Sequence, residues 1–180
     1  MTILSLLIAP HPVLRTKAVL VVPAEKATLH LVDALCEQML SLETLGVSAP
    51  MFGISKRVIV VRDQAEDKLC LMINPEIMKF SSEKQAFEEG SPSYPGISAF
   101  VERPEKISLQ YYDLQGDVQE LEAQGLLSTV IQHQMDYLEG KSFLDHLSSL
   151  KKNLLLKKME QVKKELKRNH HVHGPHCHHD

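Results

Sequence analysis

Residues 125–140, GLLSTVIQHQMDYLEG, are the stretch that decides the fold of this chain. Apolar side chains recur there with the spacing of an amphipathic α-helix. They are Leu127, Val130 and Ile131. Gly140 marks the end of this predicted helix, and His133 and Tyr137, four residues apart, share one of its faces. Two histidines at that spacing beside a glutamate are typical of metal hydrolases, but here a single histidine is present.

Outward from this helix, the chain mixes predicted helices with predicted strands. The apolar spacing indicates another amphipathic helix over 27–43, and a last helix that begins near Ser148. Alternating or β-branched runs predict strands over 57–61, 68–74, 106–113 and 118–123, with a turn at 114–117. Residues 87–96 are rich in Gly, Pro and Ser and are predicted to form a loop. This mixed order favours the α+β class, in one domain over residues 1–168.

The composition limits the classes of function. The chain has 180 residues, of which 43% are hydrophobic and 24% charged, with a net charge of −3. This charge predicts no specific recognition of nucleic acid, and no apolar run is long enough to cross a bilayer. The first residues lack the basic start of a secretory signal, so a cytoplasmic location is expected. Three widely spaced cysteines predict no disulfide framework.

The end of the chain, residues 169–180, has a composition of its own. Residues 170–180 hold six histidines and Cys177. Such a segment would bind zinc or nickel adventitiously and is expected to be disordered without metal. A purification tag and a metal-storage segment are two further interpretations of it.

Three motifs in this sequence resemble those of the bacterial peptide deformylases. These metalloenzymes remove the formyl group from the N-terminal methionine of new proteins. The segments are TLGVSAPM at 44–51, EGSPS at 89–93 and QHQMDY at 132–137, in the family's order and spacing. The resemblance extends from the first residues to the C-terminal helix. It implies a peptide deformylase fold, with mixed antiparallel strands around a central helix that carries the third motif.

The resemblance places the family's metal ligands, a cysteine and two histidines, at Ser91, His133 and Tyr137. A serine hydroxyl is a weak neutral ligand, and a phenol must lose a proton with a reference pKa of about 10. These substitutions predict no cofactor in the core. Fe²⁺, Zn²⁺ or Ni²⁺ at an altered site is the alternative.

The family's catalytic residues fall on Gln134 and Met51. An amide has no useful proton affinity, so Gln134 is not a general base, a role worth roughly 10²–10⁴ in rate. Met51 replaces a glutamine that donates to the reaction's oxyanion, and Pro92 lacks the backbone N–H of the second donor. Each such donor is worth roughly 10²–10³ in rate.

The substrate pocket implied by the family is better preserved than its chemistry. An arginine that the family uses near the substrate backbone aligns with Ser98. The positions that fall on the substrate pocket are Leu45, Gly46, Gly90, Pro92, Leu126, Thr129 and Val130. An extended peptide could therefore still bind, with main-chain pairing to the strand after Ser91.

These substitutions predict a deformylase homologue, a pseudoenzyme, that has lost metal binding and N-formylmethionine deformylation. It would keep a role in binding N-terminal peptides or the ribosome, whose phosphates suit the basic last helix. The alternative is a low-activity peptide deformylase or amide hydrolase with an altered metal site. A further alternative uses Ser91 as nucleophile and His133 as base, with Glu89 as the orienting group.

Overall fold

The computed structural model describes residues 4–171, with side chains up to residue 168. One antiparallel sheet has the order β1-β2-β3-β6-β7, and β4 and β5 form a second, two-stranded sheet. The strands are β1 Gly46–Ser48, β2 Val58–Asp63, β3 Lys68–Phe80, β4 Lys84–Ser91, β5 Tyr94–Pro104, β6 Lys106–Tyr112 and β7 Val118–Gln124. The helices are α1 Lys26–Ser41, α2 Gly125–Leu138 and α3 Ser149–His171, with short 3-10 turns η1 Pro12–Arg15, η2 Ala49–Phe52 and η3 Phe143–His146. The α+β prediction is confirmed.

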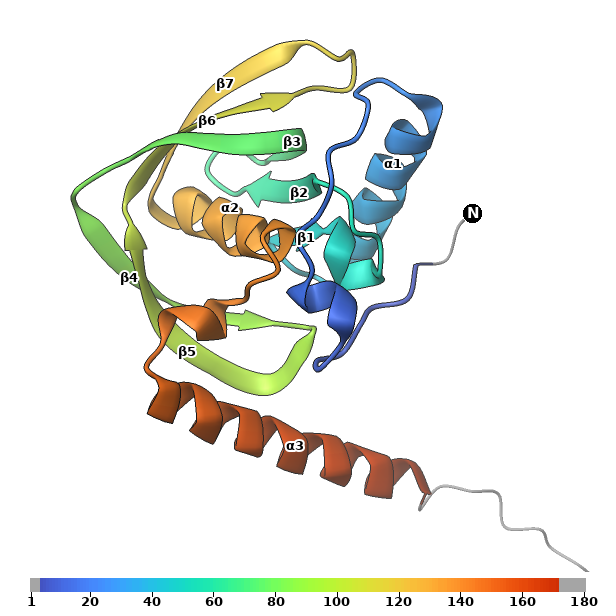
Figure 1. The fold of residues 1–180 in the computed structure, drawn as a ribbon, viewed down its shortest axis with the longest axis vertical. Helices are drawn as coiled ribbons and strands as arrows, with labels where there is room; N and C mark the ends of the chain where they lie inside the picture. The colour runs from blue at the N-terminus through green and yellow to red at the C-terminus, as the bar shows by residue number, and fades with distance from the viewer. Residues whose placement is uncertain (1–3, 172–180) are drawn as a thin grey trace, which may run out of the picture.

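Helix α2 is the central element, as predicted. It contacts strands of both sheets, and Figure 1 shows it between the five-stranded sheet and the β4–β5 hairpin. Side chains on nearly every side of it are buried, including the polar Gln132, His133 and Gln134. A helix in this position holds its polar groups away from water, so each of them needs a partner from another element.

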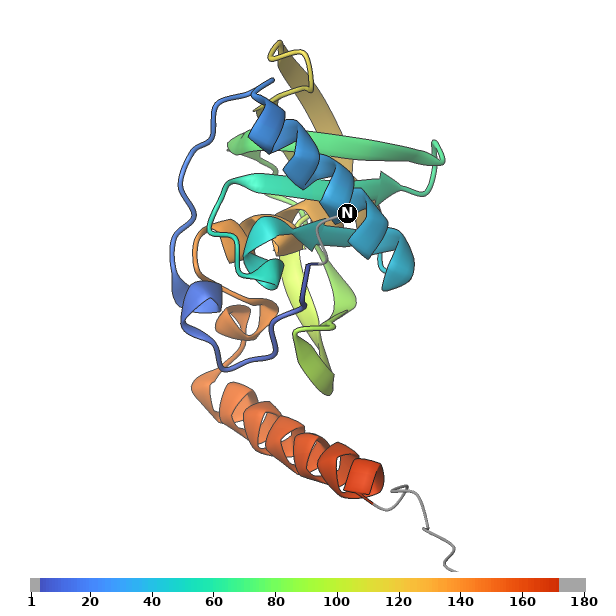
Figure 2. The same cartoon turned by 90° about the vertical axis from the view of Figure 1, so that its right-hand side faces the viewer.

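Strand β2 is buried on both faces because a helix covers each side. Val58 and Val60 pack into a cluster with α1, whereas Ile59 and Val61 pack into a second cluster with α2. This double burial explains why the sequence of β2 is a continuous β-branched run instead of an alternating one. In Figure 2, α1 lies across this sheet and α3 lies along the far end of the molecule.

The loop predicted over 87–96 is wrong, because most of it belongs to the β4–β5 hairpin. Phe87 pairs with Val101, Glu89 with Ala99 and Gly90 with Ser98, and the chain turns between Ser91 and Tyr94. The Gly, Pro and Ser residues crowd into this tight turn, while the flanking strands gain their stability from pairing and from α2 and α3. The Gly, Pro and Ser content correctly indicated a turn, but it did not indicate the strands on either side of that turn.

The other predicted elements are confirmed, and β3 continues to Phe80, well beyond its predicted end at residue 74. Strands β6 and β7 pair in register from Lys106–Gln124 to Tyr112–Val118. Gly140 ends the α2 region with a φ of 68°, and the Ser148 hydroxyl accepts the N–H of Lys151 at 3.3 Å as the cap of α3. The three-residue strand β1 and the 3-10 turns were not predicted.

Helix α3 continues to His171, so residues 169–171 are helical. Residues 172–180 lie outside the described residues, and both the His-rich tail and the domain limit at residue 168 therefore stay predictions. Within residues 4–171, no helix is long and apolar enough to cross a membrane.

Candidate functional site

The three motif segments meet around α2. The first supplies β1 and η2, the second supplies the end of β4 and the turn after it, and the third lies on α2 itself. Each segment is held by a different sheet or helix, so the shared site depends on how these elements pack.

The side chains of Ser91 and Tyr137 form a hydrogen bond with each other. Their hydroxyl oxygens lie 2.7 Å apart, and the backbone N–H of Ser93 donates to Ser91 Oγ at 3.2 Å. Tyr137 is fully buried, and this burial raises the pKa of its phenol far above the ordinary value. The phenol therefore keeps its proton, and the two hydroxyls satisfy each other.

His133 is held by a buried carboxylate. Its Nδ1 lies 3.2 Å from Glu89 Oε2, and the ring stacks on Phe143 with centroids 5.9 Å apart. It also meets the edge of the Tyr137 ring at 5.8 Å. With Nδ1 directed to Glu89, Nε2 is the nitrogen that can meet a ligand.

Glu89 is ion-paired with Arg103 in the interior. Arg103 donates from Nε to Glu89 Oε1 at 2.6 Å and from Nη2 to Oε2 at 2.9 Å. Burial alone would raise the pKa of Glu89, but the bonds from Arg103 and His133 more than offset it and lower that pKa. Glu89 is therefore a carboxylate that orients His133.

The same guanidinium continues the network toward the surface. Arg103 Nη2 donates to Asp136 Oδ2 at 2.8 Å, and His146 Nε2 lies 2.8 Å from that oxygen. Sequence reasoning missed Arg103 and His146. Arg103 carried a signal, because it continues the inward-facing series of Ile97, Ala99 and Val101 on β5. A charged residue on a buried strand face predicts an internal ion pair.

Gln134 has a fixed orientation. Its Nε2 donates to the carbonyl of Gly46 at 2.9 Å. A Cβ at Gly46 would lie 3.0 Å from Val130 and 3.1 Å from Gln134 Cγ, so a side chain there would push Val130 and Gln134 aside. The other amide atom, Gln134 Oε1, is buried and has no hydrogen-bond partner among the described residues.

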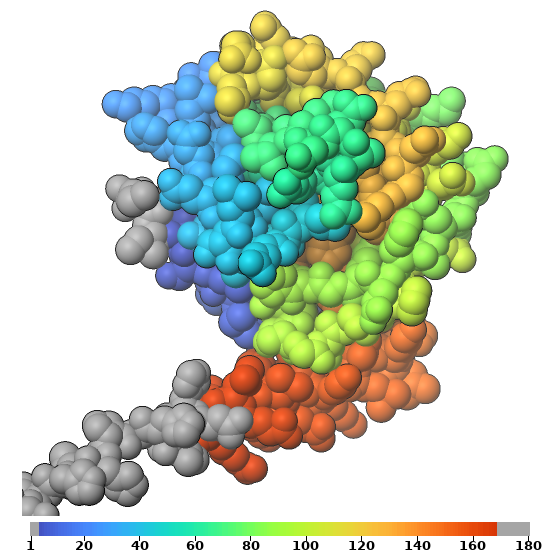
Figure 3. Space-filling model, turned by 180° about the vertical axis from the view of Figure 1, so that it is seen from behind, coloured from blue at the N-terminus to red at the C-terminus, as the bar shows by residue number. Residues whose placement is uncertain are grey.

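A pocket of about 160 Å³ opens beside His133 and Gln134. Six of the seven predicted pocket positions line it, namely Leu45, Gly46, Gly90, Leu126, Thr129 and Val130. Pro92 does not, and neither do Ser91, Tyr137 and Met51, which lie outside its lining. In Figure 3, α2 is visible in the opening between the segment around β1 and the β4–β5 hairpin.

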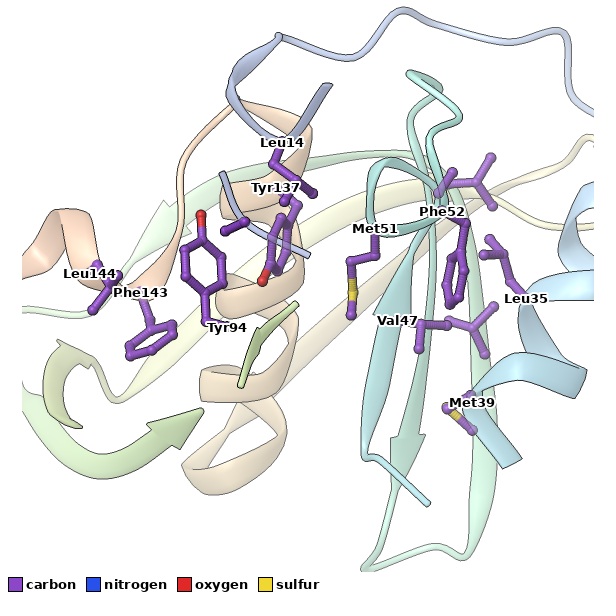
Figure 4. Packing of buried hydrophobic residues seen from close by; sticks show 14 of the residues in the cluster. Leu14, Leu35, Met39, Val47, Met51, Phe52, Tyr94, Tyr137, Phe143 and Leu144 are labelled. Atoms are coloured by element: carbon purple, nitrogen blue, oxygen red, sulfur yellow. The ribbon is translucent and has the colours of Figure 1, made fainter. Parts of the chain in front are cut away.

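Met51 is part of the hydrophobic core. It is 1% exposed and belongs to the same buried cluster as Tyr137 and Tyr94, as Figure 4 shows. Its carbonyl accepts the N–H of Leu7. The thioether therefore fills space and offers no N–H to a reacting oxygen.

The residues at the family's metal positions do not fit the family's ion. Within residues 4–171, no group of three or more His, Cys, Asp or Glu side chains could hold a metal. Ser91 and Tyr137 use their hydroxyls on each other, which leaves one imidazole. Among the described residues, the alternative of Ser91 as nucleophile and His133 as base is not supported. The Ser91 hydroxyl is hydrogen-bonded to Tyr137, and His133 Nδ1 is directed to Glu89.

Comparison with known proteins identifies the family. The family model for polypeptide deformylase matches residues 3–153. The chain belongs to the polypeptide deformylase family. It is 40% identical over 173 residues to a "Peptide deformylase-like" protein of Rickettsia conorii, covering 95% of this chain and 93% of that protein. It is 38% identical over 165 residues to the peptide deformylase of Agrobacterium fabrum, covering 90% and 97%.

The solved structures agree with the deformylase assignment. The peptide deformylase from Legionella pneumophila superimposes with a TM-score of 0.85 at 31% identity, covering 93% of this chain and 99% of that one. The predicted peptide deformylase fold is confirmed.

The predicted loss of metal binding and deformylation is contradicted. Relatives 36–41% identical over most of the chain are named peptide deformylase, and this favours the alternative, a deformylase with an altered site. The prediction of a pseudoenzyme rested on the substituted metal-ligand, base and oxyanion positions. This chain keeps the pocket and the Glu89–His133 pair.

Proposed function

We propose that this chain is a peptide deformylase-type amide hydrolase of low activity with an altered site. The observation that carries the proposal is the position of His133. Its ring lines the pocket beside apolar side chains, and a buried carboxylate holds its Nδ1. A carboxylate-oriented imidazole next to an apolar pocket suits a peptide whose first side chain is apolar, such as methionine.

The residues that are present suggest how the proton moves. His133 Nε2 would accept a proton from the water that attacks the formyl carbon, and Glu89 would stabilise the imidazolium. The C–N bond then breaks, and the proton passes to the leaving nitrogen, giving formate and a free N-terminal amine. Pro92 has no N–H and Met51 is apolar, so the oxyanion is poorly stabilised. This loss is the physical reason for expecting a low rate.

The family depends on a metal, but one imidazole beside two mutually hydrogen-bonded hydroxyls does not fit Fe²⁺, Zn²⁺ or Ni²⁺, so the proton transfer proposed above uses side chains of this chain alone. Stoichiometric metal should be measured in the full chain and in a chain lacking residues 170–180. This comparison separates metal held by the domain from metal held by the histidines of the tail.

Formate release from formyl-Met-Ala-Ser tests the proposed activity. We expect slow release that is lost in His133→Ala and retained in His30→Ala, an exposed histidine on α1 that serves as the control. Both variants should be assayed as purified, after metal loading and after chelation. Equal rates in His133→Ala and the unaltered chain would overturn the role of His133. Absence of release under every condition would overturn the activity itself.

The partners and location are proposals of the same kind. We propose nascent peptides or the ribosome as partners and the cytoplasm as location, with no membrane and no specific nucleic-acid sequence involved. Six exposed cations of α3 support a phosphate-rich partner; they are Lys151, Lys157, Lys158, Lys164, Lys167 and Arg168. Salt-dependent cosedimentation with ribosomes, weakened by charge reversal of three of these lysines, tests this part.

A further inference from the structure

A second pocket, with a volume of about 440 Å³, lies between the N-terminal segment, η1, η3 and α3. It shares no lining residue with the pocket beside His133. Small-molecule sites typically have volumes of about 300–1,000 Å³, so this pocket is large enough for a ligand of its own. Its apolar lining consists of Ala9, Pro10, Leu14, Tyr94, Leu144, Leu156 and Met159.

The hydroxyl of Tyr94 is a polar group within this apolar lining. Tyr94 is 5% exposed, and its hydroxyl takes part in no hydrogen bond among the residues with described side chains. The ring meets Phe143 edge-on with centroids 5.9 Å apart, and Figure 4 shows the phenol oxygen directed away from Phe143. Buried hydroxyls nearly always have a partner. A ligand that places a polar atom beside Tyr94 would supply one.

The charged side chains around the pocket carry an excess of positive charge. Arg15 and Lys152 line the pocket, and both donate to one carboxylate, that of Asp145. Glu160 lines it as well and is paired with Lys163 at 2.8 Å. Three cations therefore face two carboxylates, and an anionic ligand would balance the third cation.

Tyr94 lies close to these charges. The pKa of Arg15 is raised above its ordinary value, mainly by the hydrogen bond with Asp145, and Tyr94 adds to the rise. The phenol and the cations therefore lie at the same end of the pocket.

The two remaining polar residues of the lining also favour a ligand that accepts hydrogen bonds. His11 Nδ1 accepts the N–H of Val13 at 3.2 Å, so the neutral ring carries its hydrogen on Nε2 and can donate it. Ser142 is bonded to Asp145, through its N–H at 2.8 Å and its hydroxyl at 3.5 Å. The carboxylates are thus occupied, while donors remain for a ligand.

We propose that this second pocket binds an aliphatic carboxylate of the medium-chain fatty acid class. The aliphatic chain would lie against Leu14, Leu156 and Met159. The carboxylate would accept hydrogen bonds from the Tyr94 hydroxyl and the Lys152 ammonium. Because the two pockets share no residue, this inference does not rest on the proposed deformylase activity.

Titration calorimetry of the full chain with decanoate tests the proposal. We expect one decanoate to bind per chain. Decanol and decyltrimethylammonium should bind at least tenfold more weakly, because neither carries a negative charge for the cations of the pocket. All three ligands are used below the concentrations at which they form micelles.

Three variants locate the bound decanoate. Tyr94→Phe removes one hydroxyl and should weaken decanoate binding about threefold to tenfold, the contribution of one net hydrogen bond. Tyr112→Phe removes the hydroxyl of an exposed tyrosine outside the lining and should leave the affinity unchanged. Leu156→Trp fills the pocket and should abolish binding. Thermal melts establish that the variants are folded.

Three outcomes would overturn the proposal. Decanol binding as tight as that of decanoate would show that the pocket does not select an anion. Decanoate binding that persists in folded Leu156→Trp would place the ligand elsewhere on the chain. Equal affinities in Tyr94→Phe and Tyr112→Phe would show that the buried phenol does not contact the carboxylate. None of these measurements reads formate release, so their failure leaves the proposed function standing.

Discussion

At the scale of single residues, Ser91 and Tyr137 act as a pair. Each hydroxyl is the other's partner at 2.7 Å, and Tyr137 is fully buried. Replacing one of them alone removes a hydrogen bond from the hydroxyl of the other. The two substitutions are therefore energetically coupled, which the sequence could not show across 46 positions.

Removing the phenol oxygen tests this coupling. Tyr137→Phe should lower the free energy of unfolding by about 1–2 kcal/mol, because Ser91 Oγ loses the hydrogen bond to the phenol and keeps only the N–H of Ser93. The double variant with Ser91→Ala should lose less than the sum of the two single variants. Urea denaturation of the four proteins measures the difference. Strict additivity would show that the 2.7 Å contact contributes no coupling.

Glu89 makes stability depend on pH. Its pKa is lower in the folded chain than in the unfolded chain, where a glutamate titrates near pH 4.3. On acidification the unfolded chain takes up this proton first, so the folded state loses stability. The contribution of Glu89 to stability is complete above the pKa that it has in the unfolded chain. It disappears as the pH falls through the lower pKa that Glu89 has in the folded chain.

Glu89→Gln should remove this contribution. At neutral pH we expect a loss of about 3–5 kcal/mol, because Arg103 loses its bidentate partner in the interior. Below about pH 5 the stability curve of the variant should be flatter than that of the unaltered chain. The control is Glu88→Gln, at an exposed position next to it. Parallel pH curves for Glu89→Gln and the unaltered chain would contradict this assignment.

At the scale of elements, the docking of α3 on β5 depends on one glycine. Gly96 has a φ of +75°, and a Cβ there would lie 2.8 Å from both methyl groups of Val162. On the same helix, Met159 is 1% exposed in the main core cluster. The lack of a side chain at Gly96 therefore lets α3 approach closely enough to bury Met159.

Two glycines allow this contact to be isolated. Gly96→Ala should destabilise the fold by the positive-φ strain of about 1–2 kcal/mol together with the clash against Val162. Gly125→Ala has a similar φ of +62° and nothing within 4 Å of the added carbon, so it should show the strain alone. Thermal denaturation compares them. Equal losses of stability in the two variants would mean that α3 moves away from the added carbon without a loss of free energy.

At the scale of the whole molecule, the same cluster joins distant parts of the chain. It contains Leu14 near the start, Val60 in the sheet, Tyr137 on α2 and Met159 on α3. Arg15 and Lys152 both bond to Asp145, which ties η1 to η3 and α3. Such shared burial favours unfolding as one cooperative unit.

Coincident transitions are therefore expected. Far-UV circular dichroism and tyrosine fluorescence should give one midpoint in urea, since the chain has no tryptophan and its four tyrosines report on different regions. Met159→Ala should shift both probes together, with a loss of about 2–4 kcal/mol. An earlier transition seen by one probe would show that α3 unfolds separately.

What the sequence determined by itself was the set of local patterns and the family. Helix periodicity located α1 and α2, β-branched runs located β2, and the three motifs indicated the deformylase fold. These features depend on neighbours a few residues apart, so they can be read along the chain. The pocket positions came from the resemblance, and six of the seven line one pocket.

The tertiary structure alone decided which polar groups meet. It joined Ser91 to Tyr137, Glu89 to Arg103 and His133, and Gln134 to Gly46, and it turned the predicted loop at 87–96 into a hairpin. These contacts link segments far apart in sequence, and their partners are chosen by burial and packing geometry. A side chain's chemistry is visible in the sequence, but its partner is set by the fold.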